Sequence, residues 1–271
     1  MLLKLPKRKW KNLKEIEFEK ITRNLLETFI ISGKIALDLR DKGLITKIKL
    51  DNTPVTNGDL KVNEKLCNKI KSITPNIPIV SEETVELNKK IVHKNFWLVD
   101  PIDGTSDYIN NKDQFTLNAA LIINLEPVIG IIYAPALKRL FYSYGFANAF
   151  EKSDNKIKSL NCKKKNKSNE IIAVSHSSTP SDLILNIHKE YQVNKFIEMR
   201  SSYKFCVIAS GEFDLYATGA RAREWDIAAG HAIVKHAGGL VTDIKGNEFK
   251  YGKEEYKNTS LLLRRSNDLS K

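Results

Sequence analysis

One stretch of the 271-residue chain decides how it folds: Trp97-Leu98-Val99-Asp100-Pro101-Ile102-Asp103-Gly104-Thr105-Ser106-Asp107-Tyr108. Its apolar start is typical of a buried strand, and this strand runs into two carboxylates three residues apart. Gly104 permits a tight turn of the backbone, and Thr105 or Ser106 can then cap a helix that begins near Asp107. A strand end with two carboxylates beside a helix N-terminus suits a divalent cation and a phosphate together.

A second predicted strand also leads into acidic residues. The run Ile77–Val80 leads directly into Ser81-Glu82-Glu83. If this strand lies beside the first one, either glutamate meets Asp100 and Asp103 at one edge of a sheet, where the clustered negative charges need a cation. The plain alternative is a pair of polar loops, because Asp-Pro and Asp-Gly are ordinary turn dipeptides and adjacent glutamates are common on solvated surfaces.

Two further aspartates fall in the first turns of predicted helices. Thr56 or Asn57 can cap a helix that contains Asp59, and the segment Glu224–His236 predicts a helix with Asp226 near its start. The first of these helices is expected to bury Leu60, Leu66, Ile70 and Ile73. A carboxylate in a first turn is stabilised by the helix dipole, so that simpler role is open for both aspartates.

Helices alternate with short strands along the chain, which favours a layered α/β or α+β architecture. The spacing predicts a long amphipathic helix over Glu15–Leu39, whereas Lys47–Asn57 is expected to be irregular. An antiparallel meander is predicted for Phe115–Asn124, Val128–Tyr133 and Leu140–Tyr144. The polar stretch from 151 to 169 marks the expected division into an N-terminal half, 1–150, with most metal ligands, and a C-terminal half, 151–271, with substrate-binding residues and one metal ligand. Together the two halves are expected to form one catalytic unit.

Composition narrows the classes of function. Hydrophobic residues make up 42% of the chain, and no run approaches the roughly 20 apolar residues of a membrane helix. Three widely spaced cysteines favour a reducing cytoplasm, with Cys67 and Cys206 as core residues. The net charge of +12 is compatible with nucleic acid or with an anionic substrate, but the lysines are spread along the chain, which indicates a bias of composition more than a binding patch. The densest run, Lys163–Lys167, is expected to be a solvated loop. The basic segment Met1–Asn12 has no signal-peptide pattern and leaves peripheral attachment to the inner face of the membrane open.

The chain resembles the metal-dependent, lithium-sensitive phosphomonoesterases of the inositol monophosphatase superfamily, over roughly Ile21 to Leu263. Three signatures occur in the family's order: Glu82-Glu83, Asp100-Pro101-Ile102-Asp103-Gly104-Thr105 and Trp225-Asp226-Ile227-Ala228-Ala229-Gly230. Two more segments resemble the CysQ-type 3'(2'),5'-bisphosphate nucleotidases: Asp51-Asn52-Thr53-Pro54-Val55-Thr56-Asn57-Gly58-Asp59 and Ser201-Ser202-Tyr203-Lys204-Phe205-Cys206. The resemblance implies a five-layered αβαβα sandwich with the site between its halves. It also implies Mg²⁺-dependent hydrolysis of the 3'-phosphate of adenosine 3',5'-bisphosphate, as part of sulfur metabolism.

The resemblance also implies roles for individual residues. Two or three Mg²⁺ ions would be held by Glu82, Asp100, Asp103, Asp226 and the backbone carbonyl of Ile102. The attacking water would be oriented and deprotonated by Asp59 and Thr105. The positions that match substrate-binding residues are Gly104, Thr105, His176, Ser201, Lys204 and Arg221.

One position departs from the family pattern. Close relatives often carry an arginine eight residues before the aspartate of the Trp-Asp pair, where this chain has Thr218. Arg221 or Arg223 is then expected to bind the second phosphate.

The sequence leaves several alternatives open. The sulfated nucleotide 3'-phosphoadenosine 5'-phosphosulfate is a possible second substrate, and an inositol-1-phosphate or sugar phosphate phosphatase is the main alternative activity. A non-catalytic nucleotide- or RNA-binding protein is more remote, because the acidic catalytic set is intact. Both a monomer and a homodimer are compatible with the sequence.

Overall fold

The strand that contains Asp100 lies inside the larger of two sheets. The computed structural model describes residues 15–49, 52–87, 93–154, 156–163, 170–267 and 269. The expectations for Met1–Asn12, for Asp51 and for most of the run Lys163–Lys167 lie outside these residues. None of the helices within the described ranges has the length and apolar character that crossing a membrane requires.

Seven strands of the described residues form the larger sheet. Only its first two strands are parallel, and the rest form an antiparallel meander, which confirms the three meander strands predicted from the sequence. In spatial order the strands are β3 (Ile79–Ser81), β4 (Phe96–Asp103), β5 (Thr116–Ile123), β6 (Glu126–Ala134), β7 (Arg139–Ser143), β8 (Ala149–Ser153) and β9 (Lys156–Ser159).

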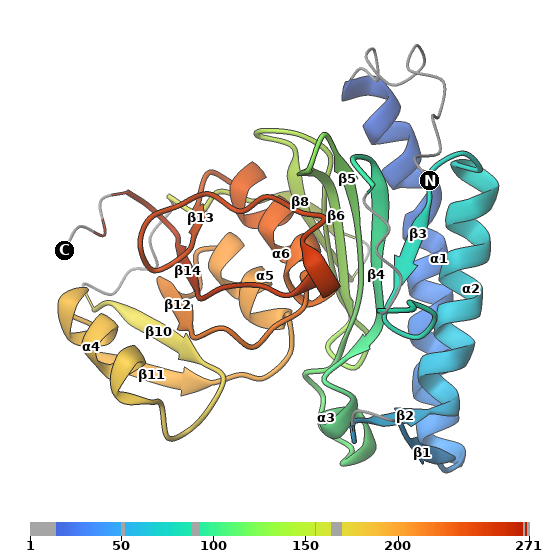
Figure 1. Cartoon of the computed structure of the whole chain (residues 1–271), viewed down its shortest axis with the longest axis horizontal. Coiled ribbons are helices and arrows are strands. Elements are labelled where there is room, and N and C mark those ends of the chain that lie inside the picture. The colour runs from blue at the N-terminus through green and yellow to red at the C-terminus, as the bar shows by residue number, and fades with distance from the viewer. Residues whose placement is uncertain are drawn as a thin grey trace.

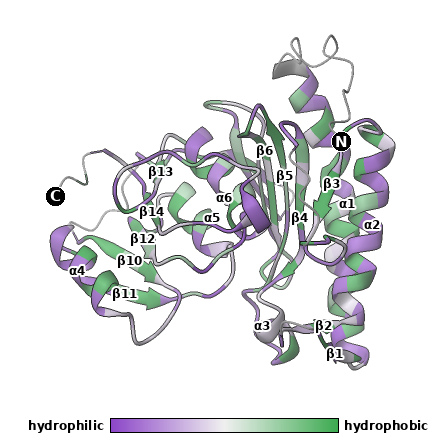
Figure 2. Cartoon of the chain, viewed as in Figure 1, coloured by the Kyte–Doolittle hydropathy of each residue, from purple (hydrophilic) through white to green (hydrophobic). Residues whose placement is uncertain are grey.

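The central strands are apolar along their whole length because both faces of the sheet are covered. Along β4, Phe96 and Leu98 belong to the core on one face, whereas Trp97 and Val99 belong to the core on the other. This alternation of side chains between two buried faces removes the usual polar positions from the strand. Figure 2 shows the resulting hydrophobic colour along the middle of the sheet, beside helices that carry both colours.

Two long helices cover the outer face of this sheet. The helix α1 (Glu15–Lys42) packs against α2 (Asn57–Ile73), and Thr56 caps α2 in a capping box with Asp59, which confirms the predicted cap. Leu60 was predicted to be buried but is 48% exposed. The stripe that α2 buries runs instead through Gly58, Asp59, Val62, Asn63, Leu66 and Ile70, which excludes Leu60 by helical phase.

The second half of the chain supplies the other three layers (Figure 1). Two helices, α5 (Tyr203–Ala209) and α6 (Glu224–His236), lie between the two sheets, and α4 (Asp182–Glu190) covers the far side of the smaller sheet. This arrangement confirms the αβαβα sandwich. In spatial order the strands of the smaller sheet are β11 (Lys195–Glu198), β10 (Ile172–Ser175), β12 (Leu215–Thr218), β14 (Leu261–Arg264) and β13 (Leu240–Thr242).

Two segments expected to be irregular or polar contain strands. The segment Lys47–Asn57, which was expected to be irregular, forms all but the first residue of an antiparallel hairpin of β1 (Thr46–Ile48) and β2 (Pro54–Thr56). The expected division at residue 150 falls inside β8, and β9 continues the larger sheet. We therefore place the division between the halves after Ser159.

The helix after the acidic motif begins earlier than predicted. The helix α3 (Thr105–Ile109) has Gly104 as its N-cap, with a left-handed φ of 88° and no side-chain capping bond. Neither Thr105 nor Ser106 caps the helix, because Thr105 is its first residue and its hydroxyl bonds elsewhere. A short 3-10 helix, Glu254–Tyr256, follows the smaller sheet's β13.

The helix α6 lies directly on β6, where Gly130 leaves room for its backbone. A Cβ at Gly130 would clash with the carbonyl oxygen of Ala229 and lie 2.8 Å from the Cβ of Ala232. This close approach positions the N-terminal turn of α6, which carries Asp226, against the larger sheet.

We predict that Gly130→Ala lowers the free energy of unfolding by about 1–3 kcal/mol, because a well-packed contact must be forced apart. The matched control is Gly219→Ala, since a Cβ at Gly219 would meet nothing within 4 Å. Urea denaturation of both variants measures the difference. Equal midpoints for the two variants would contradict the close packing of α6 on β6.

Candidate active site

The two aspartates of β4 face one cavity because the strand contains a bulge. Asp100 pairs with Asn118 of β5 and Asp103 pairs with Thr116, so three steps along β4 match two steps along β5. In a regular strand, residues three apart face opposite sides, and the extra residue of a bulge brings them to the same side. Pro101 lies in the bulge, where its missing N–H is tolerated. Both aspartates consequently line the same cavity.

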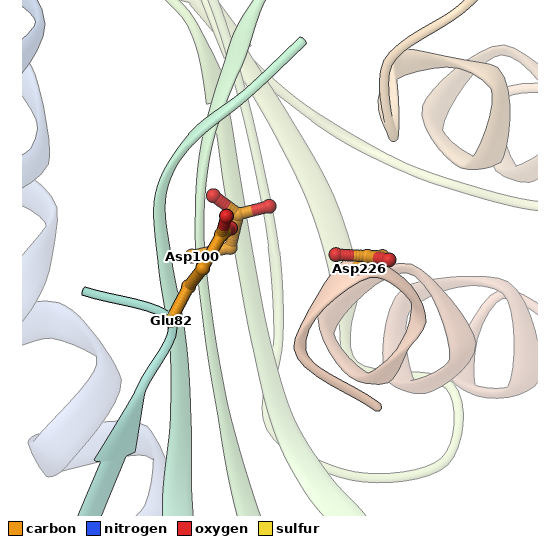
Figure 3. A group of neighbouring side chains, drawn as sticks. All are labelled: Glu82, Asp100 and Asp226. Carbon is orange, nitrogen blue, oxygen red and sulfur yellow. The ribbon is translucent and has the colours of Figure 1, made fainter. Parts of the chain in front are cut away.

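Three carboxylates from different elements converge at this point. Since β3 and β4 are parallel neighbours, Glu82 follows the end of β3 at the same sheet edge, and its N–H donates to the carbonyl of Val99 at 3.1 Å. Asp226 faces them from the first turn of α6, where its Oδ2 accepts the N–H of Arg223 at 2.7 Å. One carboxylate oxygen from each of Glu82, Asp100 and Asp226 lies within 4.8 Å of the other two (Figure 3).

This concentration of negative charge is unfavourable without a cation. Burial raises the pKa of all three carboxyl groups, and the neighbouring acids add to the effect at Asp100 and Asp226. The pKa of Asp226 rises to about 8, and that of Asp100 rises well above its usual range. Asp100 is only 1% exposed, and its Oδ1 has no hydrogen-bond partner among the described residues. Hard, convergent oxygen ligands with an unpartnered buried atom fit a divalent cation such as Mg²⁺.

Asp103 does not belong to the triad of Glu82, Asp100 and Asp226 and has two partners of its own. Its carboxylate accepts the backbone N–H of Ser202, and the charge of Lys204 opposes the rise in its pKa that burial causes. The ammonium of Lys204 donates to the carbonyls of Arg200 at 2.7 Å and Ser201 at 2.5 Å, and burial lowers its pKa to about 8. Lys204 is therefore a fixed charge in the cavity wall, held by two backbone acceptors.

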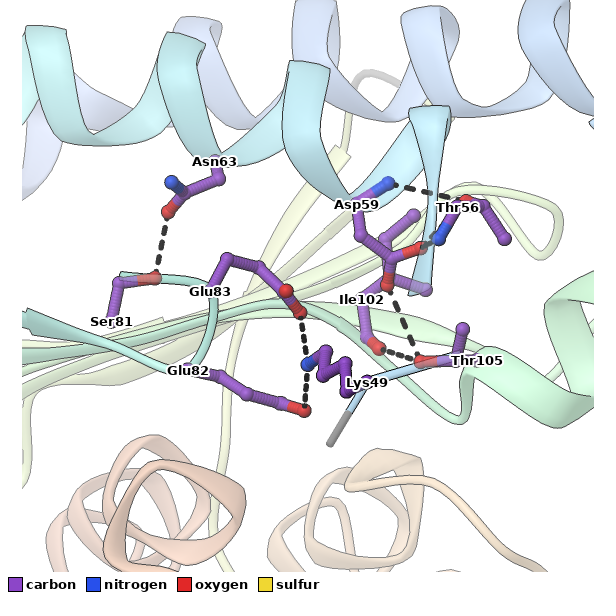
Figure 4. Close-up of polar contacts among 9 residues, drawn as sticks. All are labelled: Lys49, Thr56, Asp59, Asn63, Ser81, Glu82, Glu83, Ile102 and Thr105. Atoms are coloured by element: carbon purple, nitrogen blue, oxygen red, sulfur yellow. Dashed lines mark hydrogen bonds and ion pairs between the residues drawn. The ribbon is translucent and has the colours of Figure 1, made fainter. Parts of the chain in front are cut away.

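The predicted pair for water activation is present as a hydrogen-bonded dyad. Asp59 is 1% exposed, and its Oδ2 accepts the N–H and the hydroxyl of Thr56 at 2.8 and 2.6 Å. Its Oδ1 accepts the hydroxyl of Thr105 at 3.3 Å, and the same hydroxyl lies 3.1 Å from the carbonyl of Ile102 (Figure 4). The capping box thus fixes one oxygen of Asp59 and leaves the other facing Thr105.

Thr105 and the four carboxylates of Glu82, Asp100, Asp103 and Asp226 line a cavity of about 360 Å³, within the range of small-molecule sites, whereas Asp59 is not among its lining residues. Besides the carboxylates, its lining includes several basic and aromatic residues. Burial and the charge of Arg221 lower the pKa of His176 to about 4, so this imidazole is neutral near pH 7. The positive or aromatic lining residues are His176, Arg200, Lys204, Phe205, Tyr216 and Arg221.

Most of the expected site residues meet at this cavity. Its lining includes Glu82, Asp100, Ile102, Asp103, Gly104, Thr105, His176, Lys204, Arg221 and Asp226, as well as the unusual Thr218. Ser201 does not line it: the side chain is fully buried and its hydroxyl donates to the carbonyl of Gln114. Arg223 is also turned away, since its guanidinium donates to the carbonyl of Glu255.

Three residues of the site were not predicted from the sequence. Arg200 and Tyr216 line the cavity, yet neither belongs to a quoted motif. Lys49, which lies in a segment expected to be irregular, contacts Glu82 directly. The chain has 44 lysines and arginines, so the sequence alone does not distinguish Lys49 or Arg200 from the other basic residues.

The profile of the inositol monophosphatase family matches residues 19–268, almost the whole described chain. The chain belongs to the inositol monophosphatase family. That family depends on Mg²⁺, and the acidic cluster of this member is of the kind that such a cation requires.

Its relatives include several bisphosphate nucleotidases. The 3'(2'),5'-bisphosphate nucleotidase CysQ of Salmonella typhimurium is 34% identical over 208 residues, which cover 76% of this chain and 83% of that protein. The CysQ of Buchnera aphidicola is 38% identical over 207 residues, which cover 75% and 76%. The crystal structure of CysQ from Bacteroides thetaiotaomicron superposes with a TM-score of 0.75 at 26% identity, covering 92% of this chain and 98% of that one.

Removal of one central carboxylate tests the cation site of this family member. We predict that Mg²⁺ raises the melting temperature of the wild-type protein, by about 5–10 °C at a hundredfold excess over Kd, because the ligand binds only the folded state. Asp100→Asn should abolish this shift while the metal-free variant melts no lower than the wild type, since one buried repelling charge is gone.

The control for that experiment is Asp38→Asn, which neutralises an exposed acid on α1. Differential scanning calorimetry with and without Mg²⁺ measures all three proteins. A full Mg²⁺ shift in Asp100→Asn would refute the assignment of Asp100 as a cation ligand.

Proposed function

We propose that this chain is a Mg²⁺-dependent phosphomonoesterase that hydrolyses the 3'-phosphate of adenosine 3',5'-bisphosphate to AMP and inorganic phosphate. The observation that carries the proposal is the hydroxyl of Thr105, which lines the same cavity as the carboxylate cluster and donates to the buried Asp59; basic and aromatic residues line that cavity as well. The CysQ nucleotidases among the relatives support the nucleotide as substrate. The sulfated analogue 3'-phosphoadenosine 5'-phosphosulfate has the same 3'-phosphate and is a candidate second substrate.

The proposed cofactor is two or three Mg²⁺ ions. Their ligands would be the carboxylates of Glu82, Asp100, Asp103 and Asp226, with the carbonyl of Ile102. Four carboxylates offset the charge of two divalent ions, and a third ion would need the charge of the substrate phosphate. When bound, Mg²⁺ lowers the pKa of water and stabilises negative charge on the oxygens of the phosphate.

The chain's own residues position the water and accept its proton. Thr105 donates its hydroxyl hydrogen to Asp59, which leaves the lone pairs of the hydroxyl oxygen free to accept a hydrogen bond from water. As the water oxygen bonds to phosphorus and the bond to O3' breaks, one proton of the water moves through this dyad to Oδ1 of Asp59, and the leaving O3' takes a proton from solvent to become the 3'-hydroxyl of AMP. Gly104 and Thr105 also offer N–H groups at the start of α3, where first-turn donors have no intrahelical acceptor.

The basic and aromatic residues that line the cavity are proposed to bind the 5'-phosphate and the nucleoside. Arg221 is the best candidate for the 5'-phosphate, because it lines the cavity and Thr218 cannot supply a charge. Tyr216 and the neutral His176 offer ring surfaces for the nucleoside. Lys204 would act mainly on Asp103, since its ammonium already donates to two carbonyls.

Replacing the hydroxyl of Thr105 tests the dyad. We predict that Thr105→Val lowers kcat by about 10²–10⁴-fold with a much smaller change in KM, because water positioning matters in the transition state. Thr105→Ser retains the hydroxyl and should keep most of the activity. Phosphate release from adenosine 3',5'-bisphosphate measures both, and a Val variant altered only in KM would disprove this role.

Recognition of the second phosphate is tested with two substrates. Arg221→Leu should lower kcat/KM for adenosine 3',5'-bisphosphate by about 10–100-fold, the range expected for a lost charged hydrogen bond. The loss of kcat/KM for adenosine 3'-monophosphate, which lacks the 5'-phosphate, should be far smaller. Equal losses of kcat/KM for both substrates would contradict the role of Arg221 in binding the 5'-phosphate.

A further inference from the structure

Lys49 occupies an unexpected place at the edge of the carboxylate cluster. Its ammonium lies 3.0 Å from Oε1 of Glu82 and 2.8 Å from Oε1 of Glu83 (Figure 4). The Lys49 side chain is 20% exposed and the side chain of Glu83 only 4%, so this is a partly buried pair. No other ion pair of Glu83 occurs in the described part of the chain.

The lysine lies at the tip of the β1–β2 hairpin. Its N–H donates to the carbonyl of Thr53 at 2.8 Å, which closes the turn between the two strands. The hairpin belongs to neither large sheet, and it packs through β2 against α2 and α3. Thr53 and Pro54, which follow the turn, line the catalytic cavity. The ammonium of Lys49 is therefore a tether from the hairpin tip to the residues that follow β3.

One carboxylate serves two competing partners in this arrangement. Glu82 is a member of the triad whose oxygens converge within 4.8 Å, and it is also an acceptor for Lys49. An ammonium carries one charge and cannot neutralise the triad, whereas a divalent cation in the triad would repel it. Glu83 gives Lys49 a second anchor that lies outside the triad.

We propose that Lys49 is an internal counter-ion that competes with the divalent cation for Glu82 and shifts to Glu83 alone when the metal centre fills. Metal occupancy is thereby coupled to the β1–β2 hairpin, whose tip borders the substrate cavity. The inference rests on the proposed metal-dependent function and adds a residue that restrains metal loading.

The test is calorimetric titration of Mg²⁺ into the metal-stripped full chain, with no substrate present. Lys49→Met should lower the Kd for Mg²⁺ by about five- to tenfold, since a partly buried competing ion pair is removed. Lys49→Arg retains the charge and should bind like the wild type. Lys47→Met removes an equal charge from an exposed position on β1 and controls for long-range electrostatics.

Hydrogen exchange supplies a second readout that a merely structural lysine would not change. In the wild type, Mg²⁺ should alter the exchange of the amides between Thr46 and Thr56, and in Lys49→Met this effect of Mg²⁺ should disappear. An unchanged or weaker affinity in Lys49→Met overturns the proposal, as does an equal gain in Lys47→Met. Absence of Mg²⁺ binding by the wild type would instead overturn the proposed function itself.

Discussion

Repulsion among three carboxylates, one buried and two partly buried, is the constraint on which the site depends. Glu82, Asp100 and Asp226 are brought within 4.8 Å of one another in surroundings that raise the pKa of each. Water cannot relieve this charge at Asp100, which is 1% exposed. A bound divalent cation turns the unfavourable cluster into a stabilising one, so the folded state is linked to metal occupancy. The same carboxylates that repel one another are the proposed ligands of the cation.

Elements from both halves of the chain hold the acidic side chains of the site in place. The parallel pair β3 and β4 brings two acids to one edge, and the bulge in β4 adds a third. The close contact of α6 with β6 at Gly130 delivers Asp226 from the second half. The capping box of α2 fixes Asp59, whose Oδ1 accepts the hydroxyl of Thr105. Asp100 and Asp103 lie on β4, Asp226 lies in the first turn of α6, and Glu82 directly follows the end of β3, where its N–H donates to the carbonyl of Val99.

Much of this could be predicted from the sequence because the signals are local and strong. The apolar strand before Asp100, the cap at Thr56 and the helix that carries Asp226 are all patterns within one element. Features without a hydrophobic signal were missed. The strand β9 is exposed along its length, so its sequence looks like a loop. In α2, Leu66 and Ile70 are buried as predicted, whereas Leu60 lies outside the stripe that the helix buries.

Contacts across the fold were the least predictable part of the site. Ser201 matches a family motif, but its hydroxyl is satisfied by a backbone carbonyl of another element. The pairing of Lys49 with Glu82 joins residues 33 positions apart through a hairpin that carries no strong pattern. Such pairings arise from tertiary packing, which a single sequence specifies only indirectly.

This acidic centre is proposed to be a metal-dependent phosphatase site for a nucleotide bisphosphate. Phosphate release from adenosine 3',5'-bisphosphate and from inositol 1-phosphate, with Mg²⁺ and in the presence or absence of Li⁺, tests it most directly. We expect kcat/KM for the nucleotide to exceed that for inositol 1-phosphate by about tenfold or more, a difference of about 1.4 kcal/mol in transition-state binding, and to fall with Li⁺. A preference for inositol 1-phosphate would contradict the nucleotide assignment, and the absence of Mg²⁺-dependent release from either substrate would contradict the account as a whole.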